Sequence, residues 1–239
     1  MKRLFLSLTL VAAALGAQAQ SEVGTVSIIP RVGVTISSMS DDPLAVSDVA
    51  VLKPQYKPGF VAGADLQYQW TKNVAVSLGA YYALQGYHYK DYSSSSTEGN
   101  KYKEQDYYDL SQNLGYIQVP LMAHVYVAPG LSVNAGLQAG FLAYAKWKST
   151  LTSFTETTSS DGTVQREYDK IDGQDANNYQ WDTKNKDEFK SFGLTLPLGV
   201  SYEYEHVVLD VRYNFPLTKA VKDQNSRNKS FWFSVGYQL

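Results

Sequence analysis

Six charged residues stand on segments whose side chains alternate between apolar and polar or small. They are Arg31, Asp65, Lys146, Glu203, Asp210 and Arg212. If the apolar face of each segment lies outside, all six point into one interior, where an unpaired charge is costly. We therefore expect an ion-paired network that joins the arginines to the carboxylates. A structural plug is the favoured interpretation of this network, and a gated ion path is the alternative.

Other chemistry has little support in the sequence. The histidines, His88, His124 and His206, stand on different segments without acidic partners at ligand spacing, and cysteine is absent, so no metal site is predicted. A lipid-deacylating enzyme would need a serine and a histidine that are neighbours in space. We predict instead that His124 faces the interior as a structural residue. The sequence has no G-x-S-x-G elbow and no phosphate-binding glycine loop, so we expect no catalytic residue and no cofactor.

The segments that carry the interior charges have the period of β-strands. In the closing segment, apolar residues from Phe231 to Leu239 alternate with Trp232, Ser234, Gly236 and Gln238. The preceding segment sets Asp210 and Arg212 opposite an apolar face. A soluble sheet hides its apolar face, and that arrangement would put these charges outside. If hydrocarbon surrounds the sheet, the apolar face can lie outside and the charges can lie in the interior.

The beginning of the chain predicts export. Residues 1–19 combine Lys2-Arg3, an apolar run over 4–15 and a small-x-small pattern at 17–19, which is typical of a secretory signal peptide. A retained anchor is the alternative, although the run is too short to span a bilayer as a helix. No later run is long enough, so any membrane span must be a barrel formed by residues 20–239.

Eight strands are predicted, and the connections between them alternate in length. Tight turns are expected at 71–73, 128–130 and 205–206, and long polar loops at 38–57, 91–113, 149–190 and 217–229. This alternation predicts an all-β fold: a monomeric, eight-stranded antiparallel transmembrane β-barrel with three short periplasmic turns and four longer extracellular loops. A soluble lipocalin-like barrel with inverted faces is the alternative.

The longest predicted loop, 149–190, offers the best candidate for a binding role. Its aromatic residues Tyr168, Tyr179 and Trp181 could contact a protein partner, because long loops on rigid scaffolds often carry function. An ordinary solvent-exposed loop is the favoured interpretation of this segment, and a binding role is the alternative. The net charge of -2 gives no electrostatic basis for binding nucleic acid.

Three short motifs resemble those of the PorT-like outer-membrane β-barrel family, the small porin-family barrels of Gram-negative envelopes. They are Tyr116-Ile117-Gln118-Val119-Pro120-Leu121, then Arg212-Tyr213-Asn214 followed by Leu217-Thr218, and Val235-Gly236-Tyr237-Gln238-Leu239. The chain departs from the pattern at Phe215-Pro216 and ends in Leu where the family has Phe. The resemblance implies a Gram-negative outer-membrane location and recognition of the strand Phe231 to Leu239 by the barrel-assembly machinery.

Together these features predict a non-enzymatic outer-membrane barrel with a lumen filled by side chains, surrounded by outer-membrane lipid. Its polar extracellular loops would serve envelope structure or binding. The resemblance adds a second hypothesis, an accessory component of a protein secretion or maturation apparatus. A lipid-modifying barrel enzyme is the third.

Overall fold

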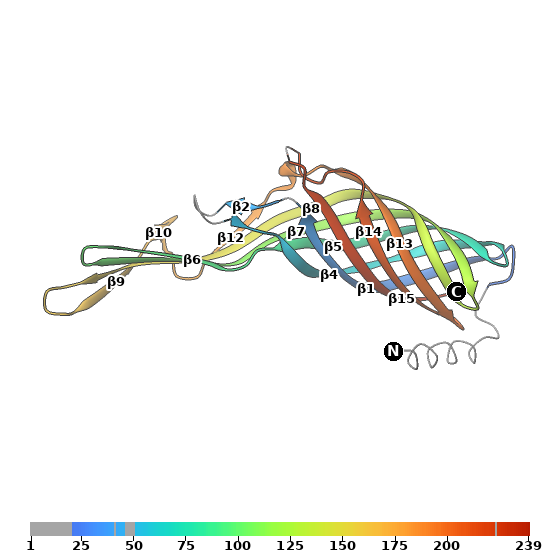
Figure 1. Cartoon of the computed structure of the whole chain (residues 1–239), viewed down its shortest axis with the longest axis horizontal. Helices are drawn as coiled ribbons and strands as arrows, with labels where there is room; N and C mark the ends of the chain where they lie inside the picture. Colours follow the sequence, from blue (N-terminus) through green and yellow to red (C-terminus); the bar gives the residue numbers. More distant parts are fainter. Residues whose placement is uncertain (1–20, 41, 46–50, 223) are drawn as a thin grey trace, which may run out of the picture.

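The computed structural model describes residues 21–40, 42–45, 51–222 and 224–239. The predicted signal peptide, 1–19, lies outside the described residues. A ring of tilted strands forms one end of the molecule, and a long ribbon of paired strands, which we call the arm, projects from the other (Figure 1). Among the described residues, no helix is long and apolar enough to cross a membrane.

Eight long strands close the ring. They are β1 (Val26–Ser40), β4 (Gln55–Thr71), β5 (Val74–His88), β7 (Lys101–Ala128), β8 (Leu131–Thr158), β13 (Phe192–Tyr204), β14 (Val207–Pro216) and β15 (Arg227–Tyr237). Each pairs antiparallel with its neighbour, and β1 pairs with β15 from Arg31↔Gly236 to Ser40↔Arg227, so the barrel has no free edge. The predicted eight-stranded antiparallel barrel is confirmed.

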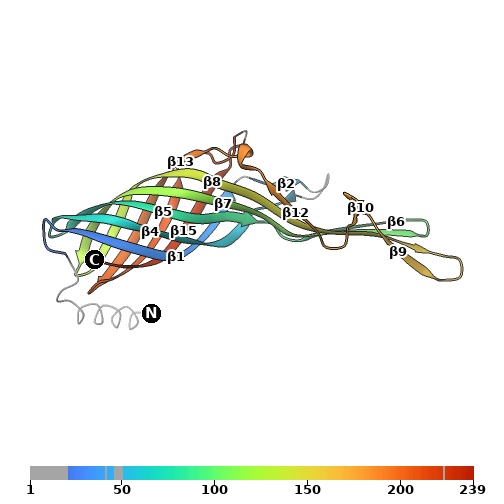
Figure 2. The same cartoon turned by 180° about the vertical axis from the view of Figure 1, so that it is seen from behind.

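The three tight turns lie together at one end of the barrel, which we call the turn end. Thr71 pairs with Val74, Ala128 with Leu131, and Tyr204 with Val207, so each turn has two central residues. Positive φ angles of 72° at Gly130 and 52° at Glu205 allow the chain to reverse within so few residues. The opposite end, from which the arm projects, is the loop end (Figure 2).

The apolar side chains face outward and the charged ones inward. Along β1, the side chains of Val32 and Val34 are 59% and 53% exposed, whereas that of Arg31, which points to the other face of the same strand, is 2% exposed. Leu121, Leu137 and Phe233 are exposed in the same way on other strands. The lipocalin-like alternative requires these residues inside and is therefore wrong.

Aromatic side chains mark both ends of the exposed apolar band. At the loop end the rings of Tyr56 and Tyr213 lie 6.5 and 4.7 Å from that of Phe231, and all three contribute to the outer surface. Near the turn end Trp70 and Tyr237 are 64% and 50% exposed. Such aromatic girdles are typical of barrels whose outer band contacts hydrocarbon.

Two of the predicted long loops are largely strand, which corrects the sequence-based expectation. β7 already begins at Lys101 and β8 runs on to Thr158, and β6 (Tyr92–Glu98) pairs with β7. Threonine, tyrosine and other good strand formers let the β7–β8 ladder continue far beyond the apolar band. The predicted boundaries were wrong because strand was inferred from apolar alternation, which ends where the arm begins.

Shorter elements complete the arm and the loop end. β9 (Val164–Tyr168) and β12 (Tyr179–Lys184) both pair with β8. The remaining elements are β2 (Leu44–Ala45) with β3 (Val51–Leu52), β10 (Lys170–Ile171) with β11 (Gln174–Asp175), and the 3-10 helix η1 (Lys186–Glu188).

Candidate functional site

Two buried ion pairs lie in the barrel lumen. The Arg31 Nε and Asp65 Oδ2 atoms are 2.8 Å apart, and Arg212 Nε donates to Asp210 Oδ1 at 2.7 Å; each of the four side chains is at most 1% exposed. The Arg31 N–H does not point at its partner oxygen, so that attraction is coulombic rather than a directed hydrogen bond. Arg31 and Asp65 reach the lumen from the neighbouring strands β1 and β4.

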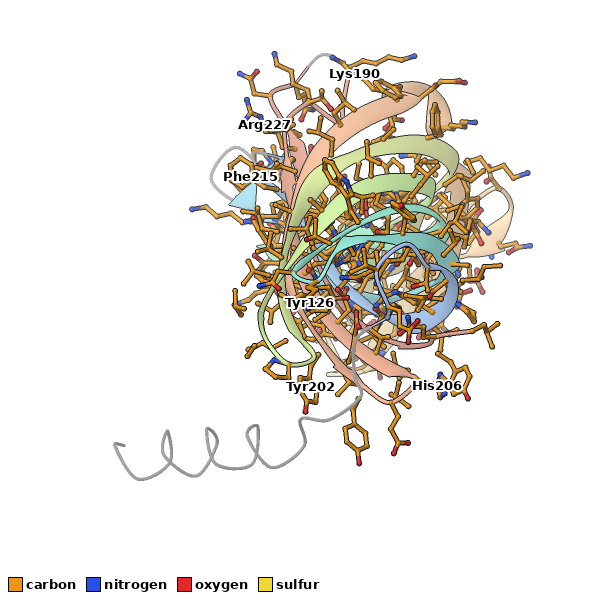
Figure 3. The ribbon with its side chains drawn as sticks, turned by 90° about the vertical axis from the view of Figure 1, so that its right-hand side faces the viewer. Tyr126, Lys190, Tyr202, His206, Phe215 and Arg227 are labelled. Atoms are coloured by element: carbon orange, nitrogen blue, oxygen red, sulfur yellow. The ribbon has the colours of Figure 1, made fainter. Side chains whose placement is uncertain are left out.

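Aromatic rings pack against these charges. The Arg212 guanidinium carbon lies 5.8 Å from the Trp232 ring, and the Tyr81 and Trp232 rings meet edge to face at 5.7 Å. A Cβ at Gly79 would lie 2.6 Å from Tyr81 and 2.9 Å from Pro120, so only glycine leaves room for this packing. Side chains crowd the inside of the ring in the view along the barrel (Figure 3).

Glu203 occupies a separate layer closer to the turn end. The Tyr126 hydroxyl donates to Glu203 Oε1 at 2.7 Å and accepts from the Gln67 amide at 3.2 Å. Glu203 is 1% exposed. The predicted arginines and carboxylates of the lumen therefore lie in three contact groups: Arg31 with Asp65, Arg212 with Asp210, and Glu203 with Tyr126.

A hydrogen-bonded chain that the sequence did not predict crosses the lumen. The Ser77 hydroxyl lies 2.9 Å from His124 Nε2, and His124 Nδ1 lies 2.9 Å from Asn134 Oδ1. The Asn134 amide donates to Ser201, whose hydroxyl donates to Asp210 at 2.7 Å. The two-residue turn at 129–130 would by itself place His124 opposite Ala135, but a bulge between Tyr126 and Ala128 shifts the register by one residue and places His124 opposite Asn134. The turn alone therefore could not have identified this contact.

The order serine, histidine, asparagine matches that of an acyl-transfer triad. However, Ser77, His124 and Asn134 are 2%, 1% and 1% exposed. A nucleophile must reach its substrate, and in this arrangement the Ser77 hydroxyl is enclosed by the barrel wall and the lumen side chains. The trio therefore serves as a satisfied polar network of the interior.

Lys146 does not join the lumen charges, contrary to the sequence-based prediction. Its ammonium forms an ion pair with Asp182 on β12, at the loop end. The cause is a bulge in β8: Tyr144 pairs with Gly115 but Leu142 pairs with Tyr116, so one extra residue stands between them. That residue reverses the alternation of faces beyond it.

The three predicted loop contacts lie in two places on the arm. The Tyr179 and Trp181 rings are 5.1 Å apart on β12, and Tyr179 pairs with Leu151 of β8. Tyr168 pairs with Phe154, and their rings are 6.1 Å apart. Since residues 151 and 154 are three positions apart on a regular strand, Tyr168 lies on the opposite face of the arm.

One row of apolar and aromatic side chains crosses the arm from edge to edge. The register pairs Tyr92 with Tyr107, Tyr107 with Leu151, and Leu151 with Tyr179, so the row spans β6, β7, β8 and β12. Trp181 extends it, two residues from Tyr179 on the same face. We call these five residues the aromatic row.

A charged cluster lies beside the aromatic row on the same face. The Ser153 hydroxyl donates to Asp169 Oδ2 at 2.7 Å, and the Lys103 ammonium lies 2.9 Å from the same oxygen. The Ser153 hydrogen bond and the Lys103 charge hold the pKa of Asp169 below its usual value. The cluster ties β7, β8 and the segment after β9 together.

Comparisons with known proteins place this geometry in a family. The family model described as "Outer membrane protein beta-barrel domain" matches residues 17–222. No curated protein matches the sequence.

Several solved structures are similar to this chain over most of its length. Ail, the attachment invasion locus protein of Yersinia pestis, is 15% identical with a TM-score of 0.43, over 91% of this chain and 100% of Ail. Neisserial surface protein A is 12% identical with a TM-score of 0.42, over 90% and 99%. OprG from Pseudomonas aeruginosa is 13% identical with a TM-score of 0.38, over 93% and 99%. The family match extends over most of the sequence, and the chain belongs to the outer membrane protein β-barrel domain family.

Proposed function

We propose that the protein is a non-enzymatic outer-membrane barrel with a closed lumen, which holds its arm outside the cell to bind a protein partner. The observation that carries this proposal is the contrast between the two parts. The lumen is filled by paired charges and packed rings, which leaves it a structural role. The arm, in contrast, displays side chains far from the apolar band.

The aromatic row is the feature of the arm best suited to a partner. Tyrosine and tryptophan supply large contact areas at low entropic cost and are enriched where proteins bind one another. The row stands on paired strands, so its shape is held in advance of binding. Burial of Ser77 speaks against the lipid-modifying alternative.

Finer parts of the proposal rest on the sequence. We infer export directed by residues 1–19, insertion into the outer membrane of a Gram-negative envelope, and recognition of the strand Phe231 to Leu239 by the barrel-assembly machinery. The PorT-like motifs support a place among the small porin-family barrels. A role beside a secretion apparatus is the second candidate within that group, carried by the motif resemblance.

Two experiments test the main proposal. In planar bilayers, the refolded barrel should give no stepwise conductance, and regular single-channel steps would contradict a closed lumen. On intact cells, a photoreactive residue in place of Tyr107 should cross-link a protein, whereas one in place of Tyr168, on the other face, should not. Equal labelling from both positions would contradict a role for the aromatic row.

A further inference from the structure

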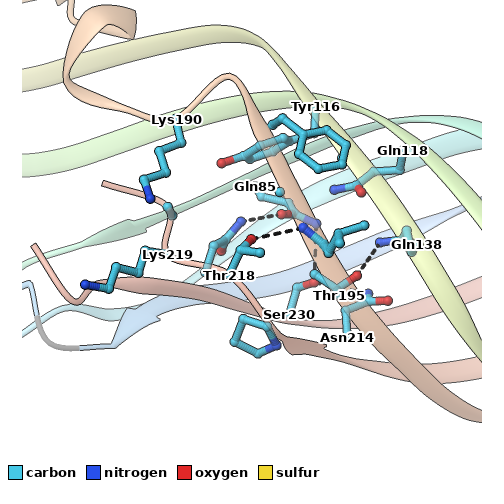
Figure 4. Close-up of a pocket in the computed structure, with 17 residues that line it drawn as sticks. Gln85, Tyr116, Gln118, Gln138, Lys190, Thr195, Asn214, Thr218, Lys219 and Ser230 are labelled. Carbon is cyan, nitrogen blue, oxygen red and sulfur yellow. Dashed lines mark hydrogen bonds between the residues drawn. The ribbon is translucent and has the colours of Figure 1, made fainter. Parts of the chain in front are cut away.

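A narrow cavity with several amide side chains in its wall lies at the loop end of the barrel, beside the start of β13 (Figure 4). Its walls come from the inner faces of β5, β7, β8, β14 and β15, the start of β13 and the segment after β14. The protein-free space is about 470 Å³, including the solvent at its opening, but only about 40 Å³ of it admits the centres of water-sized spheres. That narrow part has room for about three waters or hydroxyl-sized groups.

Buried amide oxygens without partners line the cavity. Gln118 Oε1, Gln138 Oε1 and Asn214 Oδ1 have no hydrogen-bond partner among the described residues, and the three side chains are 4%, 0% and 1% exposed. For two of them the amide nitrogen is engaged: Gln138 donates to Thr195 at 3.2 Å and Asn214 to Ser230 at 3.1 Å. The cavity therefore offers acceptors, which an occupant must match with donors.

Two lysines carry positive charge at one side of the cavity. Seventeen residues line the cavity, and they include Lys190 and Lys219 but no carboxylate. The Lys190 backbone amide donates to the Ala220 carbonyl at 2.8 Å, which links the segments that carry the two lysines. Figure 4 shows both lysine side chains on the same side of the cavity, away from Gln118 and Gln138.

These two features select one class of ligand. A fully deprotonated inorganic anion such as sulfate would leave the amide oxygens unmatched, because it brings no donors to them. A cation would match the oxygens but would be repelled by the lysines. A molecule with several hydroxyls at one end and an anionic group at the other satisfies both.

We propose that this cavity binds an acidic sugar unit, with its hydroxyls directed at Gln118, Gln138 and Asn214 and its carboxylate at Lys190 and Lys219. The narrow space admits the hydroxyls, and the ring lies in the opening. The sugar could be free or the end of a polysaccharide, since both present the same groups. This site is independent of the aromatic row on the arm.

Calorimetric titration of the refolded full chain in detergent micelles tests this inference. D-glucuronate should bind saturably, and D-glucose, which lacks the carboxylate, should bind at least about tenfold more weakly, the loss of roughly one charged contact. A galacturonate trimer in a parallel titration separates the sources: binding of the trimer points to a polysaccharide end, and binding of the monomer alone to a free sugar.

Variants identify the site. Gln118→Leu should weaken glucuronate binding about tenfold, and Lys190→Gln with Lys219→Gln should remove the preference over glucose. Gly140→Ala should also weaken glucuronate binding, because the added Cβ would lie 2.9 Å from Gln118 Oε1 and occupy the narrow space. The same changes on the arm, Gln105→Leu and Lys101→Gln, should have no effect. Absence of saturable glucuronate binding, or affinity unchanged in all the cavity variants, would overturn the proposal.

Discussion

Arg212 and Asp210 stand two residues apart on β14, and their side chains form a 2.7 Å ion pair that is completely enclosed in the lumen. The spacing of two puts both on the inner face of one strand, so the pair depends on no other element for its formation. Ser201 accepts from Asn134 and donates to Asp210, which connects the pair to the polar chain of the lumen. Several strands are thereby coupled to one arginine.

Removal of this arginine should destabilise the barrel strongly. Arg212→Ala leaves the Asp210 carboxylate buried and unpaired, and such a change typically costs about 3–5 kcal/mol in the free energy of unfolding. Urea unfolding in detergent, followed by gel mobility, measures it. Arg166→Ala breaks an exposed pair with Glu156 and should cost about 1 kcal/mol or less. Equal midpoints for the two variants would show that the lumen pair is not structural.

Gly79 should tolerate no larger side chain. The Cβ of Gly79→Val would overlap the Tyr81 ring and Pro120, and overpacking of this kind costs about 1–3 kcal/mol or more. Ala80 is its neighbour on the outer face and is exposed, so Ala80→Val should fold normally. The yield of heat-modifiable barrel after refolding compares the two. Normal refolding of Gly79→Val would contradict the packing described for the lumen.

The arm should lose order in acid. The pKa of Asp169 is lower in the folded arm than in an unfolded chain, where it is about 3.9. The folded arm therefore gains stability from this group above that pH and loses it as the pH falls through the lower folded pKa. Amide hydrogen exchange of β9 should rise in that range. In Asp169→Asn, β9 should already exchange faster at neutral pH, and its exchange should not rise further in acid. If the exchange of this variant rises in acid as much as that of the unmodified protein, Asp169 is not the cause of the acid sensitivity.

Ser77 should behave as an interior residue. A fluorophosphonate probe should not label the folded barrel, because the Ser77 hydroxyl is enclosed and hydrogen-bonded to His124. His124→Leu leaves Ser77 and Asn134 without this partner and should cost about 1–3 kcal/mol in stability. Unfolding midpoints measure the second effect. Labelling that disappears in Ser77→Ala would instead identify an active nucleophile.

The residue pattern predicted the barrel because the alternation of faces is a local property of each strand. Arg31, Asp65, Glu203, Asp210 and Arg212 could be assigned to the interior on this basis alone. Asp210 and Arg212 form a pair within one strand, but the pairing of Arg31 with Asp65 could not be predicted, because the register between β1 and β4 is set by a long connection with no sequence signal. The prediction that Lys146 points into the lumen was wrong, because a single bulge in β8 opposite Gly115 and Tyr116 reverses the alternation of faces before Lys146.

The arm escaped prediction because no apolar face runs along the length of its strands; its apolar and aromatic side chains form a row across them. Thr152, Thr155 and Thr157 favour strand through backbone preference, but a period of two is visible only when one face is buried. The grouping of Tyr179 with Trp181, apart from Tyr168, likewise depends on which part of β8 each segment pairs with. The composition indicated a polar segment with aromatic residues, but it did not predict the strands or their pairing.

The central claim is that the aliphatic face of the barrel meets hydrocarbon while its charged face is enclosed. Quenching of tryptophan fluorescence by brominated acyl chains tests it most directly. One variant keeps Trp232 as its only tryptophan, which is 1% exposed in the lumen. A second variant has all natural tryptophans replaced and carries Leu137→Trp as its only tryptophan, at an outer position that is 55% exposed. Brominated lipid should quench the tryptophan at position 137 strongly and leave Trp232 bright, and strong quenching of Trp232 with none at 137 would contradict the account.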